Sequence, residues 1–161
     1  MQQYLDVIRR VLESGQRKAN RTGVDTLSTF NVNYQIDLRE GFPLLTTKEI
    51  SWKNIVVENL WFLSGDTRID LLRKHGCKFW EPWADDNGLV PSAYGNFWRN
   101  FPVHEDGQAA FNDQIRYVVD ELRARPQSRR LVVSAWAPGN AQTSALPPCH
   151  AFWVMNVQHD E

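Results

Sequence analysis

Residues 145–153 read Ala-Leu-Pro-Pro-Cys-His-Ala-Phe-Trp, and this stretch organises the chain. Two prolines precede Cys149, and because proline fixes φ and lacks a backbone N–H, the chain enters the cysteine from a preset direction. The apolar run from Ala151 to Val157 predicts a buried strand. A thiol at the start of such a strand is placed as a nucleophile would be, but a free cysteine more often packs as a small hydrophobic residue. The stretch alone leaves both interpretations open.

Length and composition predict one globular domain. The 161 residues are 42% hydrophobic and 23% charged, which suits a packed core. The net charge of −1 argues against nucleic acid or a membrane surface as a partner, so a base-stacking role for the seven tryptophans is disfavoured. The two cysteines, Cys77 and Cys149, lack the spacing of zinc ligands, so no metal site is expected. Without a signal peptide or a membrane-spanning run, a cytoplasmic location is expected.

Hydrophobic periodicity predicts an α+β fold. Four helices are expected, over residues 4–12, 51–65, 69–72 and 111–122. Strict alternation from Phe30 to Leu38 predicts a long strand with one buried face, and residues 131–136 predict another strand. Helices and strands in this order indicate a mixed β-sheet packed against helices.

Glu58 interrupts an otherwise apolar helix, and aromatic residues crowd the loops that follow it. A carboxylate inside an apolar helix must be hydrogen-bonded, paired or raised in pKa, so it is either a structural group or a catalytic acid–base. The turn-rich residues 79–99 include Trp80, Trp83 and Tyr94. Flat aromatic walls suit a flat heterocyclic ligand, and a satellite core beneath a long loop is the alternative.

The chain resembles thymidylate synthase nearly from end to end. The matching blocks are Arg21-Thr22-Gly23, residues 41–48, residues 58–67, residues 80–85, Tyr94-Gly95, Ser128-Arg129-Arg130, residues 133–136 and residues 148–152. Any one block is weak evidence, whereas all of them in this order imply that Cys149 is the family's nucleophile. The implied fold is a thymidylate synthase-like mixed sheet that forms the interface of a homodimer.

The resemblance implies an enzyme that methylates dUMP to dTMP with methylene-tetrahydrofolate as co-substrate and with no metal. In the family a cysteine thiolate adds to carbon-6 of uracil, and Cys149 matches it. Arg21, Arg129 and Arg130 match arginines that bind the nucleotide phosphate, because guanidinium groups suit phosphate oxygens. Arg129 and Arg130 are expected to act in the neighbouring subunit's site, and their charge would favour ionised Cys149.

Three further residues match the family's proton-transfer network. Glu58 corresponds to a glutamate that works through ordered water at carbon-4 and on the folate. Tyr94 corresponds to a tyrosine near the carbon-5 proton, and His150 to a histidine of the polar network.

The folate walls are also implied by the resemblance. Trp80, Trp83 and Leu146 match residues that contact the folate ring. Ser51 stands where many members carry a histidine near the folate, so the chain departs from the family's pattern there.

The family's chain is longer than the 161 residues here. Residues 1–161 are therefore expected to form a single domain that is incomplete at its C-terminal end, with residues 159–161 beginning a turn. A second polypeptide is one source for the rest. Two other functions are alternatives to dUMP methylation: a folate-dependent pyrimidine-nucleotide hydroxymethylase and a non-catalytic dimerising remnant of the synthase. A cysteine hydrolase is weaker, because no histidine base oriented by a third group is marked.

Overall fold

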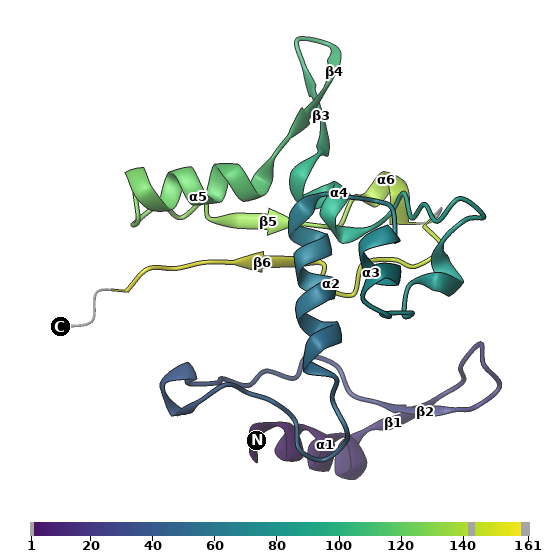
Figure 1. The fold of residues 1–161 in the computed structure, drawn as a ribbon. Helices are drawn as coiled ribbons and strands as arrows, with labels where there is room; N and C mark the ends of the chain where they lie inside the picture. Colours follow the sequence, from purple (N-terminus) through teal and green to yellow (C-terminus); the bar gives the residue numbers. More distant parts are fainter. Residues whose placement is uncertain (1, 142–143, 159–161) are drawn as a thin grey trace. The chain divides into compact units, whose positions relative to one another are not determined.

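The computed structural model describes residues 2–141 and 144–158. The chain divides into two compact units, Met1–Ser51 and Trp52–Glu161. Figure 1 shows the elements along the chain, from purple at the N-terminus to yellow at the C-terminus. The turn expected at residues 159–161 lies outside the described residues.

The first unit contains one helix and one short strand pair. Helix α1 (Gln2–Ser14) confirms the helix predicted over residues 4–12, and the amide of Gly15 closes its last turn on the Val11 carbonyl at 2.9 Å. Strands β1 (Gln16–Lys18) and β2 (Thr26–Ser28) pair antiparallel. A 3-10 turn, η1 (Leu38–Glu40), follows, and the Asp37 side chain caps it by accepting from the Arg39 amide.

The long strand predicted from Phe30 to Leu38 is wrong. Residues 31–37 adopt no regular secondary structure, and Phe30 is 95% exposed. A strand needs a neighbour that pairs with its backbone N–H and C=O groups, and alternation alone does not supply one. Within the described residues, no strand pairs with this segment. Phe30, Tyr34 and Leu38 are exposed, whereas Val32 and Ile36 are partly buried.

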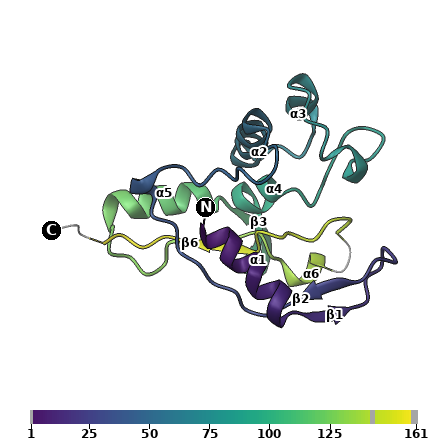
Figure 2. The ribbon, with the colours of Figure 1, turned by 90° about the horizontal axis from the view of Figure 1, so that it is seen from below.

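Three helices pack together in the second unit: α2 (Trp52–Ser64), α3 (Asp70–Lys74) and α4 (Tyr94–Arg99). Figure 2 shows them as neighbours. The first two confirm predicted helices. Helix α4 approaches α2 closely because Gly95 has no side chain: a Cβ there would lie 2.5 Å from the Phe62 carbonyl oxygen. Gly65, at φ +77°, ends α2 in the left-handed conformation that glycine tolerates best.

Helix α2 is buried on one side only. Val57, Trp61 and Phe62 face the core. Apolar residues on nearly every side of this helix predict a central position, but a second apolar stripe is exposed in the described chain. This open face of α2 consists of Trp52, Val56, Leu60 and Leu63.

The second unit holds two antiparallel strand pairs in place of the predicted mixed sheet. Strands β3 (Phe101–Glu105) and β4 (Gln108–Asn112) form a hairpin, in which Asp106 and Gly107 take the positive φ angles that tight hairpin turns require. Strands β5 (Val132–Ser134) and β6 (Phe152–Val154) form the other pair. All sheets in the described chain are small and antiparallel, so the α+β class is confirmed and the single mixed sheet is not.

Helix α5 (Gln114–Ala124) lies beside β5 (Figure 1). It begins three residues later than predicted, because Phe111 belongs to β4 and Asp113 caps the helix by accepting from the Arg116 amide at 3.0 Å. Two short elements complete the unit: the 3-10 turn η2 (Glu81–Trp83) and helix α6 (Pro138–Ala141).

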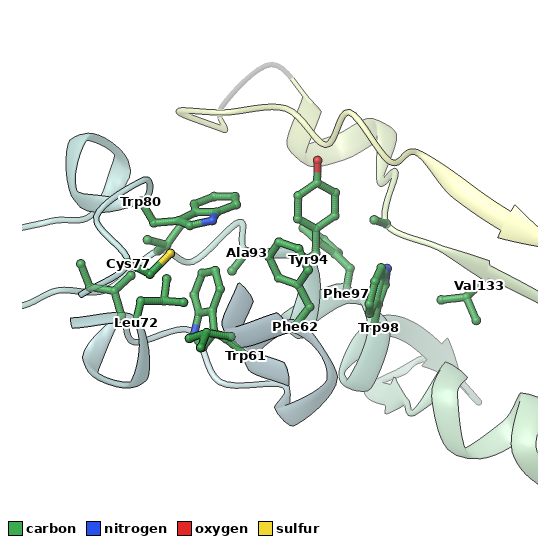
Figure 3. Close-up of a cluster of buried hydrophobic side chains, with 14 of the residues drawn as sticks. Trp61, Phe62, Leu72, Cys77, Trp80, Ala93, Tyr94, Phe97, Trp98 and Val133 are labelled. Atoms are coloured by element: carbon green, nitrogen blue, oxygen red, sulfur yellow. The ribbon is translucent and has the colours of Figure 1, made fainter. Parts of the chain in front are cut away.

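Aromatic rings form much of the core of the second unit. Figure 3 shows these side chains gathered between the helices. Phe62 makes edge contacts with Trp80, Tyr94 and Trp98, with ring centroids 4.8–5.9 Å apart. Such pairs add about 0.5–1.5 kcal/mol each to the burial of apolar area. Within the described residues, no helix has the length and apolar character needed to cross a bilayer.

Candidate active site

Cys149 sits on the segment that leads into β6. Pro148 is buried and anchors the backbone, whereas the Cys149 side chain is exposed. Its Sγ atom lies 4.0 Å from the Pro147 carbonyl oxygen. The thiol is therefore presented to solvent from a fixed backbone, as a nucleophile requires.

Tyr94 fixes that backbone from the core side. Its hydroxyl oxygen accepts hydrogen bonds from the Cys149 amide at 2.6 Å and the His150 amide at 3.3 Å. The Tyr94 and His150 rings also stack obliquely, with centroids 5.2 Å apart. Figure 3 shows the hydroxyl of Tyr94 pointing out of the aromatic cluster, toward the yellow C-terminal part of the chain. Residues 55 positions apart in the sequence thus meet at the thiol.

Burial raises the pKa of the Tyr94 phenol. The ring is only 6% exposed, and a buried phenolate loses hydration. The amides of His150 and Cys149 oppose the shift because they stabilise negative charge on the oxygen. The phenol therefore stays protonated at neutral pH. Its O–H remains available as a donor, while its oxygen accepts from the two amides.

Glu58 joins this group through Trp80. The indole N–H of Trp80 donates to the Glu58 carboxylate at 2.6 Å, which is the hydrogen bond that a carboxylate in an apolar helix needs. The Trp80 ring in turn meets Tyr94 edge to face, with centroids 6.1 Å apart. Contacts therefore run without a break from Glu58 through Trp80 and Tyr94 to Cys149. We call Glu58, Trp80, Tyr94, Cys149 and His150 the Cys149 cluster.

Four other predicted residues lie in two places. Trp83 and Leu146 are half-buried and pack against the core that contains Trp80 and Tyr94. Ser51 and Arg21 belong to the first unit. There Arg21 is exposed in a turn that the Gly23 amide closes on the Asn20 carbonyl at 3.0 Å.

A family model described as thymidylate synthase matches residues 2–161. The chain belongs to the thymidylate synthase family. It is 47% identical over 174 aligned residues to the thymidylate synthase of Haloferax volcanii, and the match covers 97% of this chain and 51% of that protein. The chain therefore spans about half the length of the curated relative it matches.

Arg129 and Arg130 are exposed in the turn that precedes β5. In the antiparallel pair, Val132 lies opposite Val154 and Ser134 opposite Phe152. The arginine turn is therefore at one end of the pair, and Cys149 is at the other. The three paired residues of β5, Val132–Ser134, therefore lie between the arginine turn and the level of Cys149. In this synthase-family chain the two predicted parts of the site are not brought together.

Sequence reasoning missed Gln114. This buried amide donates to the carbonyls of Phe97 at 2.8 Å and Ser134 at 2.7 Å, and it accepts from the Ser134 amide at 2.9 Å. It thereby joins α4, which carries Tyr94, to β5. A polar residue just after a helix cap normally faces solvent, so the sequence carries no signal for this role.

The second cysteine has a different environment from Cys149. Cys77 is 1% exposed within the core, and burial is the main cause that raises the pKa of its thiol. The described residues bring no three His, Cys, Asp or Glu side chains together in a group suited to a metal ion.

Proposed function

We propose that this chain carries the nucleophile of a thymidylate synthase that converts dUMP to dTMP with methylene-tetrahydrofolate. The observation that carries the proposal is an exposed Cys149 whose backbone is hydrogen-bonded to buried Tyr94, in a chain of the thymidylate synthase family. The family supplies the reaction, and the Cys149 cluster supplies residues of the types that the reaction needs.

Covalent attack by Cys149 is the central step of the proposed reaction. Carbon-5 of uracil is a weak nucleophile until a thiolate adds to carbon-6 and turns the ring into an enolate. Tyr94 is protonated at neutral pH and lies next to the Cys149 backbone, so it is suited to hold or pass a proton near carbon-5. Glu58, half-buried and hydrogen-bonded to Trp80, is suited to proton transfer farther along the cluster.

The residue types around the cluster fit a folate. Trp80, Trp83 and Leu146 offer apolar walls for a flat ring, and the hydrogen bond from Trp80 to Glu58 fixes one of those walls. Methylene-tetrahydrofolate, when bound, supplies the one-carbon unit and the hydride. Ser51 is proposed as a weaker contact with it, since the family's histidine is replaced there.

The phosphate is proposed to bind Arg21 together with Arg129 and Arg130 from the neighbouring subunit. The position of the arginine turn supports action in a second copy, because the turn and Cys149 occupy opposite ends of the β5–β6 pair. A homodimer with a shared site follows from this proposal.

A further segment, in this protein or in a partner, is proposed to complete the site. The chain matches about half of its Haloferax volcanii relative, so a segment equivalent to the other half is the natural candidate. Two surfaces of the described chain support this: the open face of α2, and the exposed side chains of Phe30, Tyr34 and Leu38. Exposed apolar surfaces of this kind usually mark a place where another segment or a partner binds.

The test is dTMP formation from dUMP and methylene-tetrahydrofolate by the protein as it occurs with its natural partners. Cys149→Ser should abolish product while leaving the fold intact, because the exchange is nearly isosteric. Cys77→Ala is the matched control and should retain activity, since Cys77 lies in the core outside the cluster. Formation of dTMP by Cys149→Ser at the rate of the parent would refute the proposal. A 5-hydroxymethyl product would instead indicate the hydroxymethylase.

A further inference from the structure

The backbone that carries Arg129 and Arg130 is fixed at both ends. On one side the Ser128 amide donates to the Arg125 carbonyl at 2.8 Å, just beyond α5. On the other side the Val132 amide donates to the Arg130 carbonyl at 3.0 Å, and Leu131 is completely buried. The two arginine side chains are exposed nonetheless. The chain thus presents two exposed side chains from a backbone that is hydrogen-bonded on both sides.

Glu121 is a buried carboxylate directly beneath this turn. It is 8% exposed and accepts from the Arg125 guanidinium, whose own side chain is 72% exposed. The hydrogen bond from Arg125 is the main cause that lowers the pKa of Glu121, and a hydrogen bond from the Ser128 side chain and the charge of Arg130 act in the same direction. A buried carboxylate must find such partners. Here two of them, Ser128 and Arg130, come from the arginine turn.

Ser128 links the carboxylate to the arginines. Its hydroxyl oxygen accepts from the Arg130 amide at 3.3 Å, and its side chain also contacts Glu121. An open cavity of about 360 Å³ borders this chain of contacts, and it is lined by Glu121, Arg125, Gln127, Ser128, Arg129 and Arg130. Three arginines and one buried acid therefore surround a space that an anion can enter.

We propose that Glu121 is a positioning residue for phosphate binding: through Ser128 it orients the turn so that Arg129 and Arg130 project together toward a phosphate. Glu121 itself touches no substrate in this scheme. The inference rests on the proposed function, in which these two arginines bind the phosphate of dUMP. A plain structural ion pair between Glu121 and Arg125 at the end of α5 is the alternative.

Binding of dUMP and of deoxyuridine, measured side by side, separates the two possibilities. Glu121→Ala should weaken dUMP binding about tenfold, the loss of roughly one charge-assisted contact. Binding of deoxyuridine, which lacks the phosphate, should not change. Glu121→Gln keeps an acceptor for Ser128 and should restore most of the affinity. Ser128→Ala should act in the same direction as Glu121→Ala.

Asp120→Ala is the matched control. Asp120 pairs with Arg116 on α5 as Glu121 pairs with Arg125, four residues apart, but that pair is exposed and does not line the cavity. Asp120→Ala should leave the affinity for dUMP and for deoxyuridine unchanged. Equal weakening of dUMP and deoxyuridine by Glu121→Ala, or no change in either, would overturn the inference. Should Glu121→Ala fail to fold, Ser128→Ala decides in the same way.

The combined change Arg129→Ala with Arg130→Ala separates this inference from the proposed function. It should weaken dUMP binding more than Glu121→Ala does, and Glu121→Ala should add nothing further in that background. Unchanged dUMP affinity in the double variant would refute the phosphate role of the arginines. If the double arginine variant binds dUMP more weakly but Glu121→Ala binds dUMP as tightly as the parent, only the role of Glu121 is refuted.

Discussion

Replacing Tyr94 with Phe tests how the nucleophile segment is anchored. The change removes the hydroxyl oxygen that accepts from the Cys149 and His150 amides at 2.6 and 3.3 Å. It leaves the ring in place, so the edge contacts with Phe62 and Trp80 remain. The segment should therefore loosen while the core stays packed.

The expected magnitude follows from those two bonds. A net hydrogen bond stabilises a folded protein by about 0.5–1.5 kcal/mol, and the longer bond falls at the low end of that range. Water can reach the exposed Cys149 and replace part of the loss. The segment should lose about 1–2 kcal/mol, which corresponds to a five- to thirtyfold change in the population of its open form.

Amide hydrogen exchange is the direct assay, because it reports local opening at each residue. Exchange at Cys149 and His150 should accelerate by about the same five- to thirtyfold factor in Tyr94→Phe. Tyr34→Phe is the control, because Tyr34 is 56% exposed and belongs to the other unit. Unchanged exchange at both amides in Tyr94→Phe would refute the anchoring role.

Three further changes test other parts of the structure. Gln114→Leu should lower the free energy of unfolding by about 2–4 kcal/mol in urea titrations, since it strands the Ser134 amide and two buried carbonyls; a loss below about 0.5 kcal/mol contradicts this. Gly95→Ala should cost about 1–3 kcal/mol by thermal unfolding, because its Cβ meets the Phe62 carbonyl, whereas Gly139→Ala, with nothing within 4 Å, should be neutral or stabilising; equal effects refute the close approach of α2 and α4. Folding raises the pKa of Tyr94 above its ordinary value of 10.0, so the stability that the protonated phenol contributes is complete below about pH 10 and is lost as the pH rises through the folded pKa. The melting temperature should therefore fall more steeply with alkaline pH in the parent than in Tyr94→Phe. Parallel curves for the two proteins would contradict this.

Local patterns predict helices α1, α2, α3 and α5, but not the short helices α4 and α6. Helices α1 and α2 follow from residues that repeat at helical spacing and from the glycines that end them. The periodicity starts α5 three residues too early, because it cannot show that Phe111 belongs to a hairpin strand. The Asp106-Gly107 pair is a hairpin signal, and it joins β3 to β4, strands that hydrophobic periodicity alone does not predict.

Local sequence patterns do not predict which strands pair or which distant residues make contact. Alternation from Phe30 to Leu38 shows which side chains would share a face, but not whether a second strand binds the backbone. The contact between Tyr94 and Cys149 joins residues 55 positions apart, and no local pattern encodes it. The resemblance indicated both residues separately, and the structure placed one against the other. Glu121 carries no sequence signal, because an acid four residues before an arginine usually marks an exposed helix pair.

The most direct test of the account is the intact mass of this chain, isolated with its natural partners, after incubation with 5-fluoro-dUMP and methylene-tetrahydrofolate. Fluorine at carbon-5 cannot leave as a proton does, so a working site should trap both ligands on Cys149. The account predicts a mass increase equal to nucleotide plus folate in the parent and in Cys77→Ala, and none in Cys149→Ser. An unchanged mass in the parent, or the same adduct on Cys149→Ser, would contradict the assignment of Cys149 as the nucleophile.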